Sequence, residues 1–328
     1  MNNRIIPYDF IRVIAIACIV VFHFEVAIVH IVSPSHALPF YELVGKIGVT
    51  MFFVLSGASL SLGMTRRTSL WSFYKRRFLA LFPLFWVCYL FYLLAHLLMV
   101  KDPFSGPHPA TLLLSIVGYD GFFSYKFETY YLIGEWFLGS IITLYLLYPL
   151  LEYLARKNIY LLISFCLILI LMIKSWYSLE MPLLRFPLFR MLEFTLGIYL
   201  TTIISAYQTR GLQVLNGMAL FLVVMLSAFY IHPSSLYLYT NIFAGLFSFG
   251  IIFLLTMKLS ENRLTRGMSR LSGYAYGIFL LHHPIVDNVV LRAESLLSSP
   301  LYHFCLIILS LVCSLILAVL LTSITRIM

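Results

Sequence analysis

The first apolar segment carries ionisable side chains that suit acid–base chemistry inside a membrane. Residues 10–32 read as one apolar helix, yet this helix contains Arg12, His23, Glu25 and His30. An arginine or a carboxylate at the centre of a bilayer costs about 2.5–3.5 kcal/mol on insertion scales. Ionisable groups kept in a membrane helix at that cost are candidates for a functional site, and histidine suits proton transfer because its pKa lies near neutrality.

The spacing of these residues predicts a polar stripe along one face of the helix. His23 follows Arg12 by 11 residues, which corresponds to three turns plus roughly 20° and a rise of about 16 Å. His30 lies near the same stripe, and Asp9 is placed to pair with Arg12 across one turn. Glu25 points about 200° away from His23, so we do not expect it to be the direct partner of that histidine. The stripe predicts the wall of a polar cavity; the alternative is that Arg12 reaches the interface and His23 bonds a neighbouring helix.

Two further segments carry small or basic residues that suit a binding site. Residues 45–60 (GKIGVTMFFVLSGASL) are rich in small residues that permit close helix packing, and Ser56 among them is placed to line a site. The segment SFYKRRFLALFP contains the basic residues Lys75, Arg76 and Arg77. Such a cluster usually signals topology, and the alternative is a clamp for phosphate groups.

Later segments add aromatic residues, an ion pair and two adjacent histidines. Trp136 and the tyrosines that follow it are typical of the aromatic belt of a membrane protein. Arg190 and Glu193, three residues apart, predict a structural pair within one helix. His282 and His283 project about 100° apart, so at most one of them is expected to face a shared cavity. A metal site calls for a spacing such as His-x3-His with a third ligand nearby; the sequence lacks that spacing, so we expect no metal.

The composition places these residues in an integral membrane protein. Of the 328 residues, 62% are hydrophobic and only 11% are charged, with a mean hydropathy of +0.97, whereas soluble domains have about 25% charged residues. The long apolar runs predict an all-α, polytopic bundle of about ten transmembrane helices. The predicted helices are 10–32, 45–64, 78–100, 132–150, 159–176, 188–206, 212–231, 236–257, 272–293 and 302–324. We expect residues 1–328 to form a single membrane domain without a cleavable signal peptide or an attached soluble domain, and the five cysteines to be buried packing thiols.

The basic residues gather in alternate loops and thereby predict the orientation. Fourteen of the 22 lysines and arginines fall near the termini or in one set of loops, against five in the opposite set. The basic loops are 65–77, 151–158, 207–211 and 258–270. By the positive-inside rule, both termini and these loops are cytoplasmic, so the net charge of +9 indicates topology and not nucleic-acid binding. The longest outer loop, 101–131, contains an apolar piece at 111–117 that is too short to span.

Four motifs, in this order, resemble those of acyltransferase family 3, integral membrane enzymes of which many O-acetylate surface polysaccharides. DFIRVIAIACIVVFH is similar to the first-helix signature, GVTMFFVLSG to the second-helix motif and FYKRRFLALFP to the basic third-helix motif. YGIFLLHHPI resembles the late Tyr/Phe-Leu-x-His element, with His282 on the family histidine. The resemblance covers nearly the whole chain. Two positions depart from it: Ala80 stands where the family usually has a second arginine, and Ile141 where many members have a glutamate.

The resemblance implies an acyltransferase that moves an acetyl group from cytoplasmic acetyl-CoA to a hydroxyl of a cell-surface polysaccharide or its lipid-linked precursor. The expected site residues are His23, Arg12 and Asp9 for catalysis, with His23 as base or acyl relay; Lys75, Arg76 and Arg77 for the cofactor phosphates; and Ser56, Trp136 and His282 for the substrate. The expected partners are acyl-CoA, a polysaccharide or glycolipid acceptor and the lipid bilayer, without nucleic acid, in a multi-pass protein of the bacterial cytoplasmic membrane. The competing hypothesis is an exporter of a sugar or lipid, in which the polar stripe lines a transport path.

Overall fold

The chain folds as a bundle of helices. The computed structural model describes residues 5–32, 39–63, 69–99, 107–130, 132–133, 135–176, 185–206, 236–293, 296–297 and 299–327. Within these ranges the regular structure is helical, without a strand, which confirms the predicted all-α class. The long helices are α1 (Ile6–Ile31), α2 (Pro39–Gly63), α3 (Leu70–Met99), α6 (Glu135–Lys157), α7 (Ile159–Trp176), α8 (Pro187–Ala206), α10 (Leu236–Thr256), α12 (Ala275–Arg292) and α13 (Pro300–Ile327). The shorter ones are η2 (Pro109–Thr111), α4 (Leu112–Ile116), α5 (Asp120–Phe123) and α11 (Arg263–Ser272).

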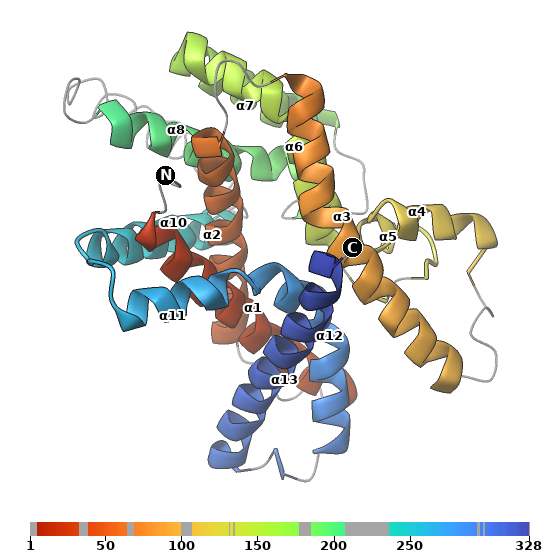
Figure 1. Ribbon diagram of the computed structural model, residues 1–328. Helices are drawn as coiled ribbons and strands as arrows, with labels where there is room; N and C mark the ends of the chain where they lie inside the picture. The colour runs from red at the N-terminus through yellow and green to blue at the C-terminus, as the bar shows by residue number, and fades with distance from the viewer. Residues whose placement is uncertain are drawn as a thin grey trace.

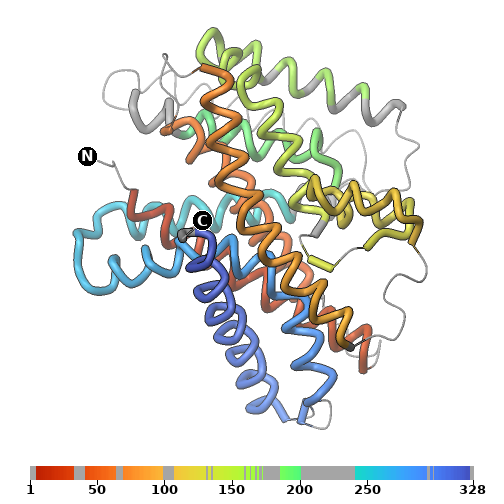
Figure 2. The backbone as a smooth tube through the Cα atoms, turned by 45° about the vertical axis from the view of Figure 1, so that its right-hand side comes forward, coloured from red at the N-terminus to blue at the C-terminus, as the bar shows by residue number. Residues whose placement is uncertain are grey.

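α1 is the central element of the bundle. It packs against α2, α10, α11, α12 and α13, and its red ribbon runs through the middle of the molecule in Figure 1. Ile11, Ala15, Val20 and Phe24 on this helix are completely buried. Beside α1, α12 and α13 lie side by side in both views (Figures 1 and 2). Because α1 contacts five other helices, side chains on its different faces lie between different pairs of helices.

α2 and α8 pack backbone to backbone at two glycines. A Cβ atom added to Gly57 would lie 1.9 Å from the carbonyl oxygen of Phe194. A Cβ atom added to Gly197 would lie 1.9 Å from the carbonyl oxygen of Val54. Small residues that let backbones approach are a common means of helix association in membranes. The close packing predicted for the second apolar segment is therefore confirmed at Gly57.

Five helices are long and apolar enough to cross a membrane, judged by length and composition among the described residues. They are Ile6–Ile31, Tyr41–Gly63, Leu70–Leu98, Trp136–Lys157 and Pro300–Thr325. α3 and α13 expose large apolar side chains such as Trp71, Leu98, Leu301 and Phe304, as expected of surfaces that face lipid. Nine of the ten predicted segments overlap helices, and the tenth, 212–231, lies outside the described residues. The number of spans and the cytoplasmic placement of the termini remain predictions.

Several segments predicted as loops are helical. α3 begins at Leu70, so the basic cluster of residues 75–77 lies on a helix and not in a loop. α6 continues to Lys157, and α11 occupies much of the predicted loop 258–270. The length of an apolar run marks only the part of a helix that lies in lipid, whereas backbone hydrogen bonding continues into the polar flanks. At α11, a capping box between Asn262 and Thr265 supports the start of such a polar helix.

The five cysteines are all free. Cys88 and Cys166 are buried, and Cys18 and Cys313 are partly buried. Cys305 is exposed, on the apolar outer surface of α13. The prediction of buried packing thiols is therefore correct for two cysteines and wrong for Cys305, because an apolar run identifies a membrane helix without telling which of its faces meets lipid.

Residues 107–130 fold onto the bundle as short helices. α4 has five residues, in agreement with the prediction that 111–117 is too short to span. α5 packs on α6 and begins with Asp120, which is 1% exposed and accepts a hydrogen bond from the backbone N–H of Gly121 at 2.9 Å. Burial raises the pKa of the Asp120 carboxyl to about 6.

Candidate active site

Two cavities lie along α1, and each is lined by one of the polar residues predicted to share a stripe. Arg12 lines a cavity of about 230 Å³, here called the arginine cavity. His23 lines a cavity of about 500 Å³, here called the histidine cavity. The rise between the two positions is about 16 Å. The stripe was expected to form the wall of one cavity, and it contributes instead to two.

The arginine cavity combines two guanidinium groups with hydroxyl groups. Its polar lining comes from Arg12, Ser56, Ser59, Arg77, Tyr145 and Tyr276. Tyr145 is hydrogen-bonded to Ser56 and lies within electrostatic reach of both arginines. Among the described residues no carboxylate lines this cavity. A lining of arginines and hydroxyls suits an anion with several oxygen atoms, such as a phosphate.

Both positions at which the chain departs from the family pattern line the arginine cavity. Ala80 and Ile141 contribute to its wall. Each of them presents an apolar side chain where the pattern has a charged one. Arg12 and Arg77 are consequently the charged residues on this wall, within the part of the chain that the structure describes.

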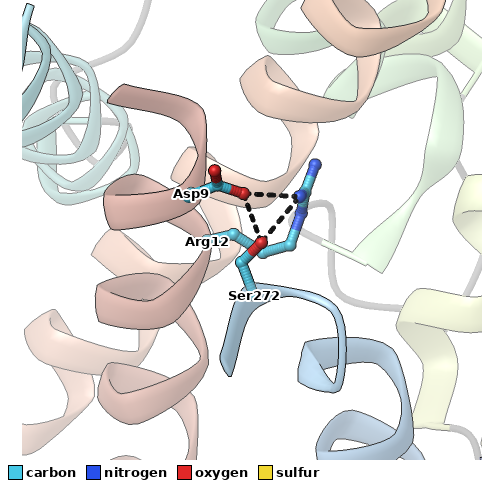
Figure 3. A network of polar contacts seen from close by, with 3 residues as sticks. All are labelled: Asp9, Arg12 and Ser272. Atoms are coloured by element: carbon cyan, nitrogen blue, oxygen red, sulfur yellow. Dashed lines mark hydrogen bonds and ion pairs between the residues drawn. The ribbon is translucent and has the colours of Figure 1, made fainter. Parts of the chain in front are cut away.

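A three-residue network holds Arg12 beside the arginine cavity (Figure 3). The hydroxyl of Ser272, the last residue of α11, donates a hydrogen bond to Oδ1 of Asp9. The same hydroxyl accepts a hydrogen bond from Nη1 of Arg12 at 3.4 Å, and Nη1 lies 3.9 Å from Oδ1 of Asp9. The predicted pair of Asp9 and Arg12 is therefore confirmed, with Ser272 as an unpredicted third member that joins α11 to α1.

The basic cluster at the start of α3 divides between two environments. Arg77 lines the arginine cavity. Lys75 and Arg76 are exposed and line neither cavity; Nε of Arg76 donates to the backbone oxygen of Ser72 at 3.2 Å. The structure thus brings one of the three expected phosphate-binding residues to Arg12, because consecutive residues of a helix point in different directions.

The histidine cavity is lined by residues from five long helices, from the short helix α5 and its C-terminal end, and from the turn that precedes α8. His23 and His283 line it together with Trp136. Its charged lining residues are Glu42, Lys46, Arg185 and Arg190. Nζ of Lys46 lies 2.6 Å from Oε1 of Glu42, so the opposite charges of this pair largely cancel.

Three histidine rings meet at this cavity. The ring centroids of His23 and His283 are 4.0 Å apart, and those of His23 and His282 are 5.0 Å apart. Nδ1 of the completely buried His282 is bonded to the backbone oxygen of Phe279 at 2.7 Å. One potential ligand nitrogen from each ring lies within 4.8 Å of those of the other two, a spacing from which the three could hold a metal ion. His283 lines the cavity whereas His282 does not, so the expected substrate contact of His282 is one that His283 is better placed to make.

A buried ion pair supports the wall of the histidine cavity. Nη1 of Arg190 lies 2.7 Å from Oε1 of Glu193, which also accepts a hydrogen bond from Oγ1 of Thr50 at 2.6 Å. This confirms the predicted intrahelical pair and extends it to α2. The guanidinium of Arg190 also lies over the rings of Phe53 and Trp136, at 5.4 and 5.9 Å from their centroids. Trp136, expected to contact substrate, is thereby fixed at the cavity, as cation–π contacts favour.

The other polar residues of α1, Glu25 and His30, lie outside both cavities. Oε1 of Glu25 lies 2.6 Å from Nε2 of His303 on α13, in agreement with the prediction that Glu25 points away from His23. His30 is exposed in the last turn and lines neither cavity. Position along a helical stripe does not by itself bring a residue to a site, because the neighbouring helices must also enclose it.

Aromatic rings occupy the space between the two cavities. Phe279 lines the arginine cavity, and its ring centroid lies 6.1 Å from that of His282. Phe137 lines the same cavity and packs on Phe279 with centroids 5.3 Å apart. Since His282 is in turn next to His23, Phe279 forms a direct link between the wall of the arginine cavity and the histidine cluster.

Sequence reasoning missed Ser272 and the position of Tyr145. Ser272 is separated from Asp9 by 263 residues, and no local pattern indicates such a contact. Tyr145 was read as an aromatic belt residue, yet it lines the arginine cavity. Nine residues, about two and a half turns, separate Tyr145 from Trp136 on α6, so the two side chains point to opposite sides of the helix and the position of one does not indicate that of the other.

The comparison with protein families agrees with this arrangement. Residues 6–319 match the family described as an acyltransferase domain, Acyl_transf_3. Neither the curated proteins nor the solved structures contain a significant match. The match covers nearly the whole chain and carries acyl transfer as the general activity, in a multi-pass membrane protein. The chain therefore belongs to acyltransferase family 3.

Proposed function

We propose that the protein transfers an acetyl group from acetyl-CoA to a hydroxyl group of a cell-surface polysaccharide or of its lipid-linked precursor, in the bacterial cytoplasmic membrane. The observation that carries this proposal is that α1 contributes charged and titratable side chains to two separate cavities. Arg12 and Arg77 line one cavity, and His23 lines the other. An acyl-CoA-dependent transferase needs both an anion-binding region and a base.

The arginine cavity is the proposed binding region for the donor. Acyl-CoA carries its negative charges on phosphate groups, and guanidinium groups bind phosphate through paired, charge-assisted hydrogen bonds. With both termini on the cytoplasmic side, the first turn of α1 and the basic start of α3 lie near that side, where acyl-CoA is made. Asp9 and Ser272 then act as positioning residues, because they hold the guanidinium of Arg12 in place.

His23 is the proposed base. As the acceptor hydroxyl attacks the thioester carbonyl, a carbon–oxygen bond forms and the carbon–sulfur bond breaks. The hydroxyl proton passes to the unprotonated nitrogen of His23 and from there to the departing thiolate of CoA. In the alternative course, His23 itself accepts the acyl group and then delivers it to the hydroxyl; both courses require a neutral His23 with access to the thioester.

The donor must reach from one cavity to the other. The two positions are about 16 Å apart along α1, and the long, flexible pantetheine arm of acyl-CoA suits that separation. Phe137 and Phe279 lie on the way. In this proposal the arm passes these rings, and the acceptor enters the larger histidine cavity from the other side.

The proposal is tested by following labelled acetyl groups. Membranes containing wild type, His23→Ala or His30→Ala at equal abundance are incubated with acetyl-labelled acetyl-CoA, and label is counted in the polysaccharide and glycolipid fractions. We expect label with wild type and with the exposed control His30→Ala, and none with His23→Ala. Equal label with His23→Ala would retain the enzyme and remove His23 as its base.

A binding measurement separates the transferase from the exporter. Acetyl-CoA should raise the melting temperature of the purified protein if the arginine cavity binds the donor. An absence of label with every variant, together with no stabilisation by acetyl-CoA, would contradict the proposal and favour the exporter.

A further inference from the structure

We propose that His23, His282 and His283 form a binding site for a transition-metal ion of the Zn²⁺ class, and that the bound ion inhibits acyl transfer. Imidazole nitrogen is a preferred ligand of Zn²⁺, Co²⁺, Ni²⁺ and Cu²⁺. The metal site itself stands on geometry alone. Its inhibitory effect rests on the proposed function, because it depends on His23 acting as the base or acyl carrier.

The three rings come from two helices that pack together. His23 belongs to α1, and the two adjacent histidines belong to α12, a helix in direct contact with α1. The centroid separations of the three ring pairs are 4.0, 4.8 and 5.0 Å. One nitrogen per ring lies within 4.8 Å of those of the other two. A tetrahedral zinc ion with Zn–N distances of about 2.0–2.1 Å holds its nitrogens about 3.3 Å apart, so modest side-chain rotations close the site.

One of the three rings is already oriented as metal-binding histidines are. Nδ1 of His282 lies 2.7 Å from the backbone oxygen of Phe279. In a neutral ring this bond places the proton on Nδ1 and the lone pair on Nε2. A histidine that binds metal through one nitrogen commonly donates its other N–H to a backbone carbonyl, which fixes the ring and its tautomer.

The surroundings leave a fourth coordination position. His23 and His283 line the cavity of about 500 Å³, which has room for water or an exchanging ligand. Three histidines and one open position are the ligand set of several zinc sites that bind water. Among the described lining cations, Lys46 is paired with Glu42 and Arg190 with Glu193.

Arg185 is the charge that opposes metal binding. It lines the same cavity and acts electrostatically on His23. A cation bound by the three histidines would be repelled by this guanidinium. The substitution Arg185→Gln is therefore expected to tighten metal binding, whereas a change in a distant residue should leave metal binding unchanged.

Metal binding and base catalysis compete for the same lone pair. A nitrogen of His23 that coordinates a metal ion cannot accept a proton or an acyl group. Zn²⁺ should therefore inhibit the transfer reaction, and a chelator should restore it.

The experiment uses the purified full-length protein, freed of metal with a chelator and titrated with Co²⁺ and then Zn²⁺. We expect one Co²⁺ per chain with the visible absorption of a tetrahedral site, displaced by Zn²⁺. Replacing His283 with alanine or with asparagine should weaken binding by at least about tenfold, because even the loss of an outer-shell partner of a ligand costs about 10–100-fold. His30→Ala, on the same helix as His23 but exposed, should bind like wild type, and Arg185→Gln should bind several-fold more tightly. Size-exclusion profiles identify any variant that fails to fold.

The outcomes separate the metal site from the proposed function. An absence of Co²⁺ binding to the wild type, or binding that survives His282→Ala and His283→Ala unchanged, would overturn the site. Binding unaffected by Arg185→Gln would contradict the placement of the ion within electrostatic reach of this guanidinium. Tight binding in a protein that transfers no acyl group even without metal would leave the site standing and contradict the proposed function. Full transfer activity at saturating Zn²⁺ would overturn the inhibition.

Discussion

The two cavities along α1 differ in the kind of charge that they present. The arginine cavity has permanently charged guanidinium groups, and Asp9, the carboxylate beside Arg12, lies outside its lining. In the histidine cavity, two of the three lining cations are paired with carboxylates, and the imidazoles are groups without a permanent charge, whose nitrogen atoms can accept a proton or bind a metal ion. The first environment suits binding of a permanently charged anion such as a phosphate, and the second suits proton transfer or ligand exchange. In the proposed function, one helix separates donor binding from proton transfer by about 16 Å, so each activity should be removable without the other.

The largest effect is expected from removing the imidazole of the histidine cavity. His23→Gln should lower kcat by about 10²–10⁴-fold, the usual contribution of a general base. The KM for acyl-CoA should stay within about twofold of wild type, because the arginine cavity is untouched. Initial rates at varied acyl-CoA measure both constants, with His30→Gln as the matched control. An increase in KM at unchanged kcat would show that the two cavities do not divide the work in this way.

The next effect is expected from removing a guanidinium from the arginine cavity. Arg77→Gln should raise the KM for acyl-CoA by about 10- to 100-fold, because hydrogen bonds to charged groups contribute about 1.5–3 kcal/mol. kcat should change much less. Arg76→Gln is the control, since Arg76 is exposed and lines neither cavity. Similar losses in both variants would mean that the helix start acts through its overall charge and not through the cavity.

A substitution between α2 and α8 should weaken both cavities together. In Gly57→Ala the new methyl group meets the carbonyl of Phe194, so the helices must separate; overpacking of this kind costs about 1–3 kcal/mol. α2 supplies residues to both linings, so kcat should fall and KM should rise in parallel with a lower melting temperature. Gly63→Ala, which meets nothing within 4 Å, is the control. A selective change in one kinetic constant would contradict a common scaffold.

The smallest effect is expected in the pH dependence of protein stability, through Asp120 beside the histidine cavity. The pKa of Asp120 rises to about 6 in the fold from an ordinary value of 3.8, so the folded state holds this proton more tightly than the unfolded state. Stability should be highest below about pH 4, decline between about pH 4 and 6 and then level off. Melting temperatures from pH 4 to 8 should show this decline in wild type and a flatter curve in Asp120→Asn. Parallel curves for the two proteins would mean that Asp120 is not responsible.

The sequence was sufficient for the class of the fold and for the most local contacts. Long apolar runs predicted helices, and the spacings of three residues predicted the pairs of Asp9 with Arg12 and of Arg190 with Glu193. Helix ends were predicted less well, as at α3. An apolar run marks the part of a helix that lies in lipid, whereas the hydrogen-bonded helix continues into the polar residues beside it. Contacts within one turn depend only on helix geometry, which is the same in every protein.

The arrangement around the site could not be read from the sequence. Arg12 and His23 were expected to share one cavity, but they line two, of which α3 contributes only to the first and α5 and α8 only to the second. The prediction of no metal site rested on spacings within single helices, whereas the three-histidine cluster combines two rings of α12 with a third from α1. Which face of α12 meets α1 depends on the packing of the entire bundle, and no periodicity encodes it.

The sequence separation of 263 residues between Asp9 and Ser272 also determines when their contact can form during biosynthesis. Synthesis proceeds from the N-terminus, at about 5–20 residues per second, so α1 is made long before α11 and α12. Until those helices arrive, Asp9 and Arg12 lack the hydroxyl of Ser272, and His23 lacks the two imidazoles of α12. The Asp9–Arg12–Ser272 network and the histidine cluster therefore form only after most of the chain has been made.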